Sequence, residues 1–242
     1  MSKVSDFVER VKTERDAQIL VVGILFFTVA FPTAFAVAAS NVESGGLTAV
    51  GDYVVNGEVI AITLEDGGEY IADGDTWSFT QHSDSERAQI QAAGGNVIGL
   101  RITLTYDEDE TVGNAPICIA PGQDGADTIS ASLTHGEHTG SGDGTNPGSH
   151  TVNLYWVNET LLQAAENGDV ISDMSGADIS EQLDAGDAGL GEYDIEVGVT
   201  AETGNAGPGC SREDNGEQVD WVVEVLVLDF TVAPYLEVDP TL

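Results

Sequence analysis

Hydrophobic and polar residues alternate along most of the chain after residue 41. In the stretch NVIGLRITLTYD, at 96–107, every second residue from Ile98 to Tyr106 is apolar, and polar residues such as Arg101 lie between them. The stretch GEYDIEVGVTAE, at 191–202, repeats the pattern with Tyr193 at its start. Successive side chains of a strand point to opposite faces, so each stretch predicts a strand with one buried and one exposed face.

Five further strands are predicted by the same pattern, and together they indicate one fold class. They lie at 53–64, 76–80, 128–134, 152–156 and 218–232. The last is apolar on both faces for much of its length, which is typical of a central strand. Within residues 41–242, helix is expected only at 85–95 and at 159–168, where Gly168 is a candidate C-cap. Turns rich in Gly, Asp and Asn separate the strands, so we predict a mainly β protein, an antiparallel β-sandwich.

Residues 17–40 follow a different pattern, because they contain no charged residue. As a helix they would be about 36 Å long, enough to cross the roughly 30 Å core of a bilayer. Pro32 is compatible with a membrane helix. Four basic residues precede the segment, and the next one is Arg87. The positive-inside rule then predicts a cytoplasmic N-terminus and an extracellular C-terminal part.

A cleaved secretory signal is the alternative interpretation of this segment. Residues 19–31 would form its apolar core, and 34–36 and 36–38 offer small-residue cleavage patterns. Both interpretations predict export. The chain then divides into a cytoplasmic tail at 1–16, a transmembrane helix at 17–40, a β-rich region at 41–125 and a β-sandwich at 126–242. Whether 41–125 is a separate domain stays open from the sequence.

Two stretches resemble known families. The junction TERDAQILVVGILFF, at 13–27, resembles the N-termini of archaeal type IV pilin-like proteins, in which a charged stretch leads into an apolar helix that packs inside a filament. The basic residue followed by glycine that is typical of that family is absent, because Asp16 follows Arg15. This departure puts processing by a prepilin-type peptidase in doubt.

The second resemblance is to immunoglobulin-like domains. Trp156, the run GEYDIEV at 191–197 and the long final strand resemble strands C, F and G of such a domain, over residues 125–234. The resemblance implies that Tyr193 is a corner tyrosine and that Trp156 and Tyr193 pack in the core. Ile195 stands where antibody-type domains have a cysteine.

The charge of the chain is extreme, at −35 with 42 acidic and seven basic residues. Residues 1–16 hold four of each, which leaves 38 acidic and three basic residues after the tail. Such a surface needs concentrated salt to screen its own repulsion. The composition resembles that of proteins from extreme halophiles and suggests an archaeal cell surface. Nucleic-acid binding is excluded, because no basic patch exists to neutralise phosphates.

Candidate chemistry is sparse. Cys118 and Cys210 are the only cysteines, and an exported chain most simply pairs them in a disulfide. His135, His138 and His150 could form part of a metal site, although incidental histidines on a surface hairpin are the simpler interpretation.

Two further ligand or modification sites are suggested by short sequence patterns. Acidic clusters at 65–75, 107–110 and 122–127 could hold a structural Ca²⁺, but none has EF-hand spacing and a solvated surface is the alternative. Asn158 begins the glycosylation sequon Asn-Glu-Thr. The sequence contains no nucleophile elbow, P-loop or dinucleotide-binding fingerprint, so no catalytic residue and no other cofactor are predicted.

These observations predict a single-pass, non-catalytic membrane protein with a structural or adhesive role at the cell surface. Its expected partners are the lipid bilayer and other surface proteins or copies of itself. Three alternatives remain from the sequence: a pilin-like filament subunit, an exported metal-dependent hydrolase that uses the three histidines, and a membrane protein of a halophile virus.

Overall fold

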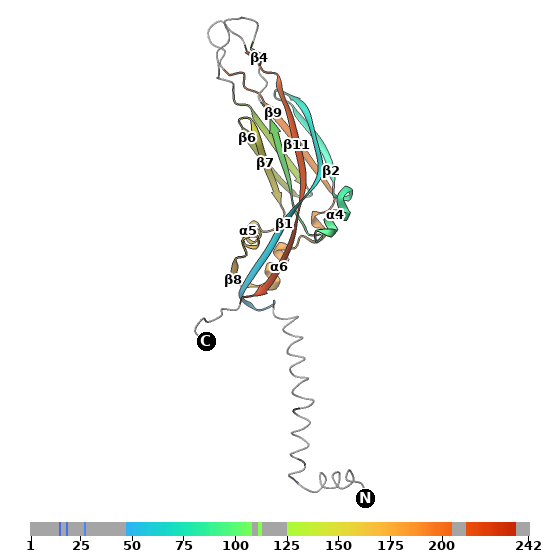
Figure 1. Ribbon diagram of the computed structural model, residues 1–242, viewed down its shortest axis with the longest axis vertical. Coiled ribbons are helices and arrows are strands. Elements are labelled where there is room, and N and C mark those ends of the chain that lie inside the picture. Colours follow the sequence, from blue (N-terminus) through green and yellow to red (C-terminus); the bar gives the residue numbers. More distant parts are fainter. Residues whose placement is uncertain are drawn as a thin grey trace.

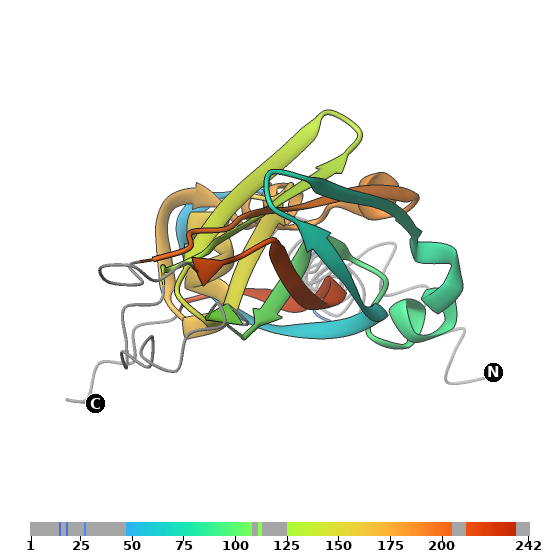
Figure 2. The same ribbon diagram turned by 90° about the horizontal axis from the view of Figure 1, so that it is seen from above.

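The computed structural model describes Arg15, Gln18, Phe27 and residues 47–107, 111–112, 125–204 and 212–235. Two antiparallel sheets lie face to face (Figures 1 and 2). The five-stranded sheet has the order β7-β3-β11-β1-β8, and the four-stranded sheet has the order β2-β9-β5-β6. The first comprises β1 (Val50–Ala72), β3 (Val97–Tyr106), β7 (Gly148–Tyr155), β8 (Val170–Ser175) and β11 (Gly216–Pro234). The second comprises β2 (Thr76–His82), β5 (Thr128–His135), β6 (His138–Thr145) and β9 (Glu192–Thr200).

Short elements complete the described fold. The two-residue strands β4 (Thr111–Val112) and β10 (Arg212–Glu213) pair with each other. The helices are α4 (Arg87–Ala92), α5 (Glu159–Asn167) and α6 (Gly176–Leu183), with 3-10 turns η2 (Ser83–Glu86) and η3 (Gly186–Gly189). Helix α5 begins at the N-cap Asn158 and ends at Gly168, whose φ of 71° is the left-handed conformation expected of a glycine C-cap.

Strands β1 and β11 form the longest ladder of the protein. Their register runs from Tyr53 opposite Pro234 to Ala72 opposite Gly216, with one bulge between Thr63 and Glu65. At about 3.3 Å per residue, the 23 residues of β1 have a contour length of roughly 75 Å. Residues near the start of β1 and the end of β11 therefore lie side by side at one end of the sandwich, which we call the base; the opposite end is the distal end (Figure 1).

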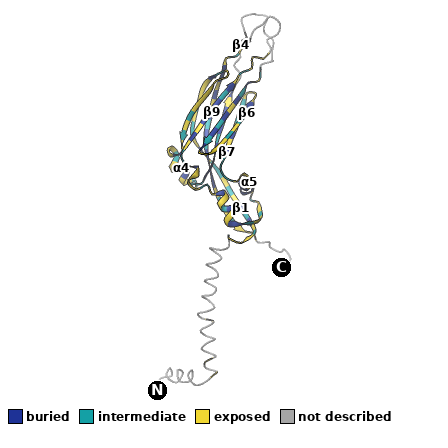
Figure 3. Cartoon of the chain, turned by 180° about the vertical axis from the view of Figure 1, so that it is seen from behind, coloured by how far each residue is buried: buried dark blue, intermediate teal, exposed yellow. Residues whose placement is uncertain are grey.

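The central position of β11 explains why both of its faces are apolar. Val223, Val225 and Val227 join the core between the two sheets. Leu226 and Leu228 point the other way and pack with α5 and α6 in a second cluster. Buried residues accordingly occupy both the space between the sheets and the helix-covered face near the base (Figure 3).

The predicted mainly β, antiparallel, sandwich-like fold is confirmed, as are the seven predicted strands and the helices at 85–95 and 159–168. The boundary between 41–125 and 126–242 does not divide the sheets. Strand β1 pairs with β11, and β2 pairs with β9, so each sheet takes strands from both regions. The first region therefore extends the same sandwich.

Strand β6 was not predicted, because its sequence HTGSGDGT has no apolar alternation. Its alternate glycines instead leave room for β7. A Cβ added at Gly140 would lie 3.3 Å from the Leu154 Cβ, and one at Gly142 would lie 3.0 Å from the Val152 Cγ2. Missing side chains thus allow the edge of the four-stranded sheet to approach β7 closely.

Among the described residues, no helix combines the length and the hydropathy needed to span a bilayer. The predicted transmembrane segment at 17–40 lies outside the described residues except for Gln18 and Phe27.

Candidate functional site

The structure does not bring the three candidate metal histidines together. His135 ends β5 and His138 begins β6, and the two are register partners across a two-residue turn. His150 lies on β7 against Gly144, six residues along β6 from His138, which corresponds to about 20 Å. Only His135 and His138 are therefore neighbours.

Both ring nitrogens of His135 are already engaged. Nδ1 lies 2.9 Å from the carbonyl oxygen of Glu192, and Nε2 lies 2.6 Å from that of Ala188. The ring is 8% exposed and packs against Trp156 and Tyr193, with centroid distances of 4.9 and 4.8 Å. A metal ligand needs a free nitrogen lone pair, so this arrangement assigns His135 a structural role.

A buried aromatic corner surrounds this histidine. The hydroxyl of Tyr193 donates to the carbonyl of Gly189, four residues upstream, at 2.5 Å. This is the hydrogen bond expected of a corner tyrosine. The Trp156 indole Nε1 donates to the carbonyl of Val97 at 2.6 Å. Trp156 was expected in mid-strand but directly follows the last residue of β7, and from there it reaches back over β3.

The buried hydroxyl of Tyr193 provides a test at alkaline pH. Burial raises the pKa of Tyr193 to about 12, from about 10. Between pH 10 and 12 the folded state therefore keeps the hydroxyl proton of Tyr193, whereas the unfolded state loses it. The contribution of this hydroxyl to the free energy of unfolding is complete below pH 10 and is lost as pH rises from 10 to 12. We expect the unfolding free energy to fall by about 2–3 kcal/mol over that window.

Denaturant unfolding of wild type and Tyr193→Phe at pH 9, 11 and 12 measures this contribution. At pH 9 the free energy of unfolding of the variant should be about 1 kcal/mol below that of wild type, because one hydrogen bond is missing. Between pH 10 and 12 the variant should lack the loss of stability that the Tyr193 hydroxyl causes in wild type. Tyr70→Phe is the matched control, because Tyr70 is 46% exposed. Parallel alkaline declines in wild type and Tyr193→Phe would contradict the assignment.

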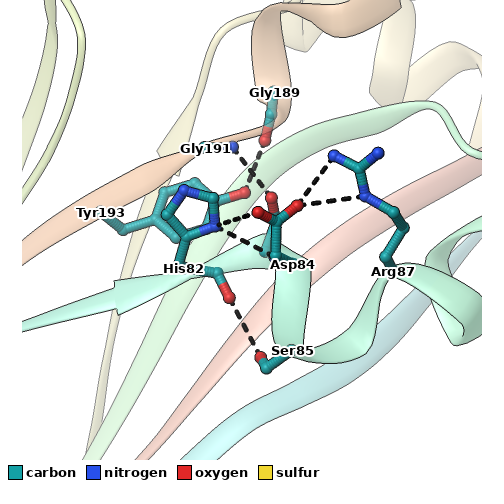
Figure 4. A network of polar contacts seen from close by, with 8 residues as sticks. His82, Asp84, Ser85, Arg87, Gly189, Gly191 and Tyr193 are labelled. Carbon is teal, nitrogen blue, oxygen red and sulfur yellow. Dashed lines mark hydrogen bonds and ion pairs between the residues drawn. The ribbon is translucent and has the colours of Figure 1, made fainter.

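A second polar network lies beside this corner (Figure 4). Asp84 Oδ1 is 2.8 Å from Arg87 Nη2, and Asp84 Oδ2 is 3.3 Å from His82 Nδ1. The hydroxyl of Ser85 donates to the backbone carbonyl of His82 at 3.0 Å, not to its ring. Histidine, aspartate and serine are thus close together, but the hydroxyl has no contact with a base that could activate it. The network caps η2 and connects it to α4.

The outer face of the four-stranded sheet is lined by hydroxyl and carboxylate groups. Asp194 on β9 lies between Thr80 and Thr134 in register, and Glu196 lies between Ser78 and Ser132. Two shallow hollows of about 310 and 370 Å³ lie along this face, and their described linings contain no basic residue. This chemistry suits water and cations and offers nothing to an anionic ligand.

The acidic clusters predicted from the sequence have different environments. In the cluster at 65–75, Glu65 is half-buried and the other acidic residues are exposed. Of the cluster at 107–110, only Asp107 is described, and it is exposed. In the cluster at 122–127, Asp127 is fully buried and lies near Asp214 and Glu217. Local sequence did not predict this group, because its members come from distant parts of the chain.

Asn158 acts as a helix cap in the structure. Its Oδ1 accepts the N–H groups of Thr160 and Leu161 at 3.0 and 3.2 Å, and its Nδ2 donates to Gln182 at 2.8 Å. The side chain is exposed, so the structure accounts for Asn158 without a glycan and leaves glycosylation a prediction. Cys118 and Cys210 lie outside the described residues, and their disulfide also stays a prediction.

The chain matches no family model, and no curated protein matches it.

Proposed function

We propose that this protein is a non-catalytic structural or adhesive protein of an archaeal cell surface, anchored in the membrane by residues 17–40. The observation that carries the proposal is the arrangement of the β1–β11 ladder. The start of β1 and the end of β11 lie side by side at the base, where Tyr53 is opposite Pro234 and the Tyr235 N–H donates to the Asp52 carbonyl at 2.8 Å. An anchor that precedes β1 would hold the base at the membrane and the distal end away from it.

The composition of the surface supports the same role. The outer face of the four-stranded sheet presents hydroxyls and carboxylates, which hold water and cations in concentrated salt. The described histidine and serine contacts support packing and capping. They give no support to the alternative of a metal-dependent hydrolase, which stays a prediction from the sequence.

We further propose that the sandwich is immunoglobulin-like. The Tyr193–Gly189 hydrogen bond supports this assignment. The strand order departs from it, because the strands that resemble C, F and G share one sheet in such domains, whereas β9 lies in the four-stranded sheet and β7 and β11 lie in the five-stranded sheet. Trp156 departs from the pattern, because it follows β7 instead of lying within it. The pairing of Val112 with Arg212 is compatible with a disulfide between Cys118 and Cys210, which stays a prediction from the sequence.

The topology can be tested with cysteines introduced on the two sides of the membrane. In intact cells, a membrane-impermeant maleimide should label Ser141→Cys, on the exposed face of β6, and should label Ser5→Cys only after lysis. The unmodified chain reports any labelling of its own cysteines. Labelling of Ser5→Cys and not Ser141→Cys in intact cells would reverse the proposed topology.

A fractionation of the same cells separates an anchored protein from a filament subunit. Recovery in the membrane pellet and extraction by detergent as a single chain supports the proposal. Recovery in sheared filaments supports the pilin-like alternative instead.

A further inference from the structure

Three carboxylates from distant segments converge at the distal end of the sandwich. Asp127 directly precedes β5, Asp214 lies between β10 and β11, and Glu217 is the second residue of β11. One carboxylate oxygen of each lies within 4.8 Å of the others. Asp127 and Glu217 are both 0% exposed, and Asp214 is half-buried.

Hydrogen bonds fix the position of Asp127. Its backbone carbonyl accepts the Tyr106 hydroxyl at 2.8 Å and the Asn146 N–H at 3.3 Å. Its Oδ1 accepts the Glu202 N–H at 2.7 Å. Its other oxygen, Oδ2, is buried, and no group in the described part of the chain forms a hydrogen bond with it. The residue is thus held in place with one carboxylate oxygen available for a ligand.

Asp214 is oriented by its own turn, because its Oδ1 accepts the Gly216 N–H at 3.2 Å. Three carboxylates this close repel one another, and burial removes the water that would weaken the repulsion. A cation between them converts the repulsion into attraction. The cluster itself contains neither histidine nor cysteine, and such an oxygen-only set suits hard cations such as Ca²⁺ and Mg²⁺.

The spacing favours the larger of these ions. Ca²⁺ binds oxygens at about 2.3–2.6 Å, so it can bridge oxygens up to about 5 Å apart and tolerates irregular geometry. Mg²⁺ requires about 2.1 Å and a near-ideal octahedron. We propose that Asp127, Asp214 and Glu217 bind one Ca²⁺. The ion would join the start of β5 in one sheet to the start of β11 in the other. This inference does not depend on the proposed cell-surface function.

Terbium provides a direct probe, because Tb³⁺ replaces Ca²⁺ and emits when a nearby tyrosine is excited. Tyr106 is suitably placed, since its hydroxyl contacts the Asp127 backbone. The full-length protein in detergent and concentrated salt should give tyrosine-sensitised Tb³⁺ emission that added Ca²⁺ displaces. Asp127→Asn and Glu217→Gln should each weaken Ca²⁺ binding about 100-fold or more, because each removes one buried charged ligand.

The matched control is Asp220→Asn, which removes an exposed carboxylate of the same strand. This variant should bind Tb³⁺ and Ca²⁺ like wild type, which separates the site from diffuse cation binding to an acidic surface. Excess EGTA should lower the melting temperature of wild type and Asp220→Asn, and should leave that of Asp127→Asn unchanged. If Asp127→Asn does not fold, Glu217→Gln and the EGTA response of wild type decide the question.

Two results would overturn the proposal. One is Tb³⁺ emission and Ca²⁺ affinity that are the same in wild type, Asp127→Asn and Glu217→Gln. The other is a wild-type protein that keeps no Ca²⁺ after desalting into concentrated NaCl and melts at the same temperature with and without EGTA. Either would mean that the three carboxylates do not form a Ca²⁺ site.

Discussion

We expect the protein to unfold when the salt concentration is lowered from about 2 M to about 0.1 M. After residue 16 the chain has 38 acidic residues and three basic ones, so most of its carboxylates cannot be paired with a basic side chain. The Debye length grows from about 3 Å at 1 M salt to about 10 Å at 0.1 M, and repulsion between neighbouring carboxylates grows with it. A domain has only about 5–15 kcal/mol of stability to lose.

Melting temperatures measured by circular dichroism across this salt range test the expectation. NaCl and KCl should stabilise the protein similarly at equal ionic strength, and sucrose of equal osmolality should not replace them. The double variant Asp194→Asn, Glu196→Gln should remain folded at lower salt than wild type, because both residues are exposed on the same face of β9. A melting temperature that does not change with salt would contradict this explanation.

The second large effect is expected from Gly189→Ala. A Cβ at this position would lie 2.1 Å from the backbone carbonyl oxygen of Val97 and 2.9 Å from the Trp156 Nε1. A backbone atom cannot move aside as a flexible side chain can, so β3 or η3 must shift and the Tyr193–Gly189 hydrogen bond must distort. Overpacking in a core costs about 1–3 kcal/mol, and this backbone clash should cost at least about 3 kcal/mol.

Chemical denaturation of Gly189→Ala in concentrated salt measures the loss. Gly51→Ala is the matched control, because the nearest atom to a new Cβ there is the Tyr53 Cε2 at 3.9 Å. The control should stay within about 0.5 kcal/mol of wild type. A Gly189→Ala protein as stable as the control would mean that the corner does not pack as described.

The sequence predicts elements whose burial follows simple alternation, and it fails where other physics controls the strand. In β9, Tyr193, Ile195 and Val197 are buried as the pattern requires. Strand β6 packs closely against β7, and this contact requires alternate glycines where other strands have apolar side chains. Helix α6 carried a usable signal that was not recognised, since the N-cap Ser175 accepts the Asp178 N–H.

The candidate sites show why proximity in sequence is a poor guide to proximity in space. His138 and His150 are near each other in the chain, but His138 begins β6 and His150 lies on β7 beside the other end of β6. Asp127 and Glu217 are far apart in the chain and lie close together at the distal end. The reason is that β5 and β11 belong to facing sheets and each of these two strands begins at that end. No local sequence motif predicts this contact.

The β1–β11 ladder also determines how the protein would respond to mechanical force. Strand β1 runs from the base to the distal end without interruption, so tension between these ends is carried by its covalent backbone. The hydrogen bonds to β11 lie across the direction of pull, and force passed between the strands would load many of them in shear at once. Pulling Val50 and Pro234 apart at the base would instead open the ladder one pair at a time. Resistance to force should therefore be strongly directional, high along the sandwich and low across its base.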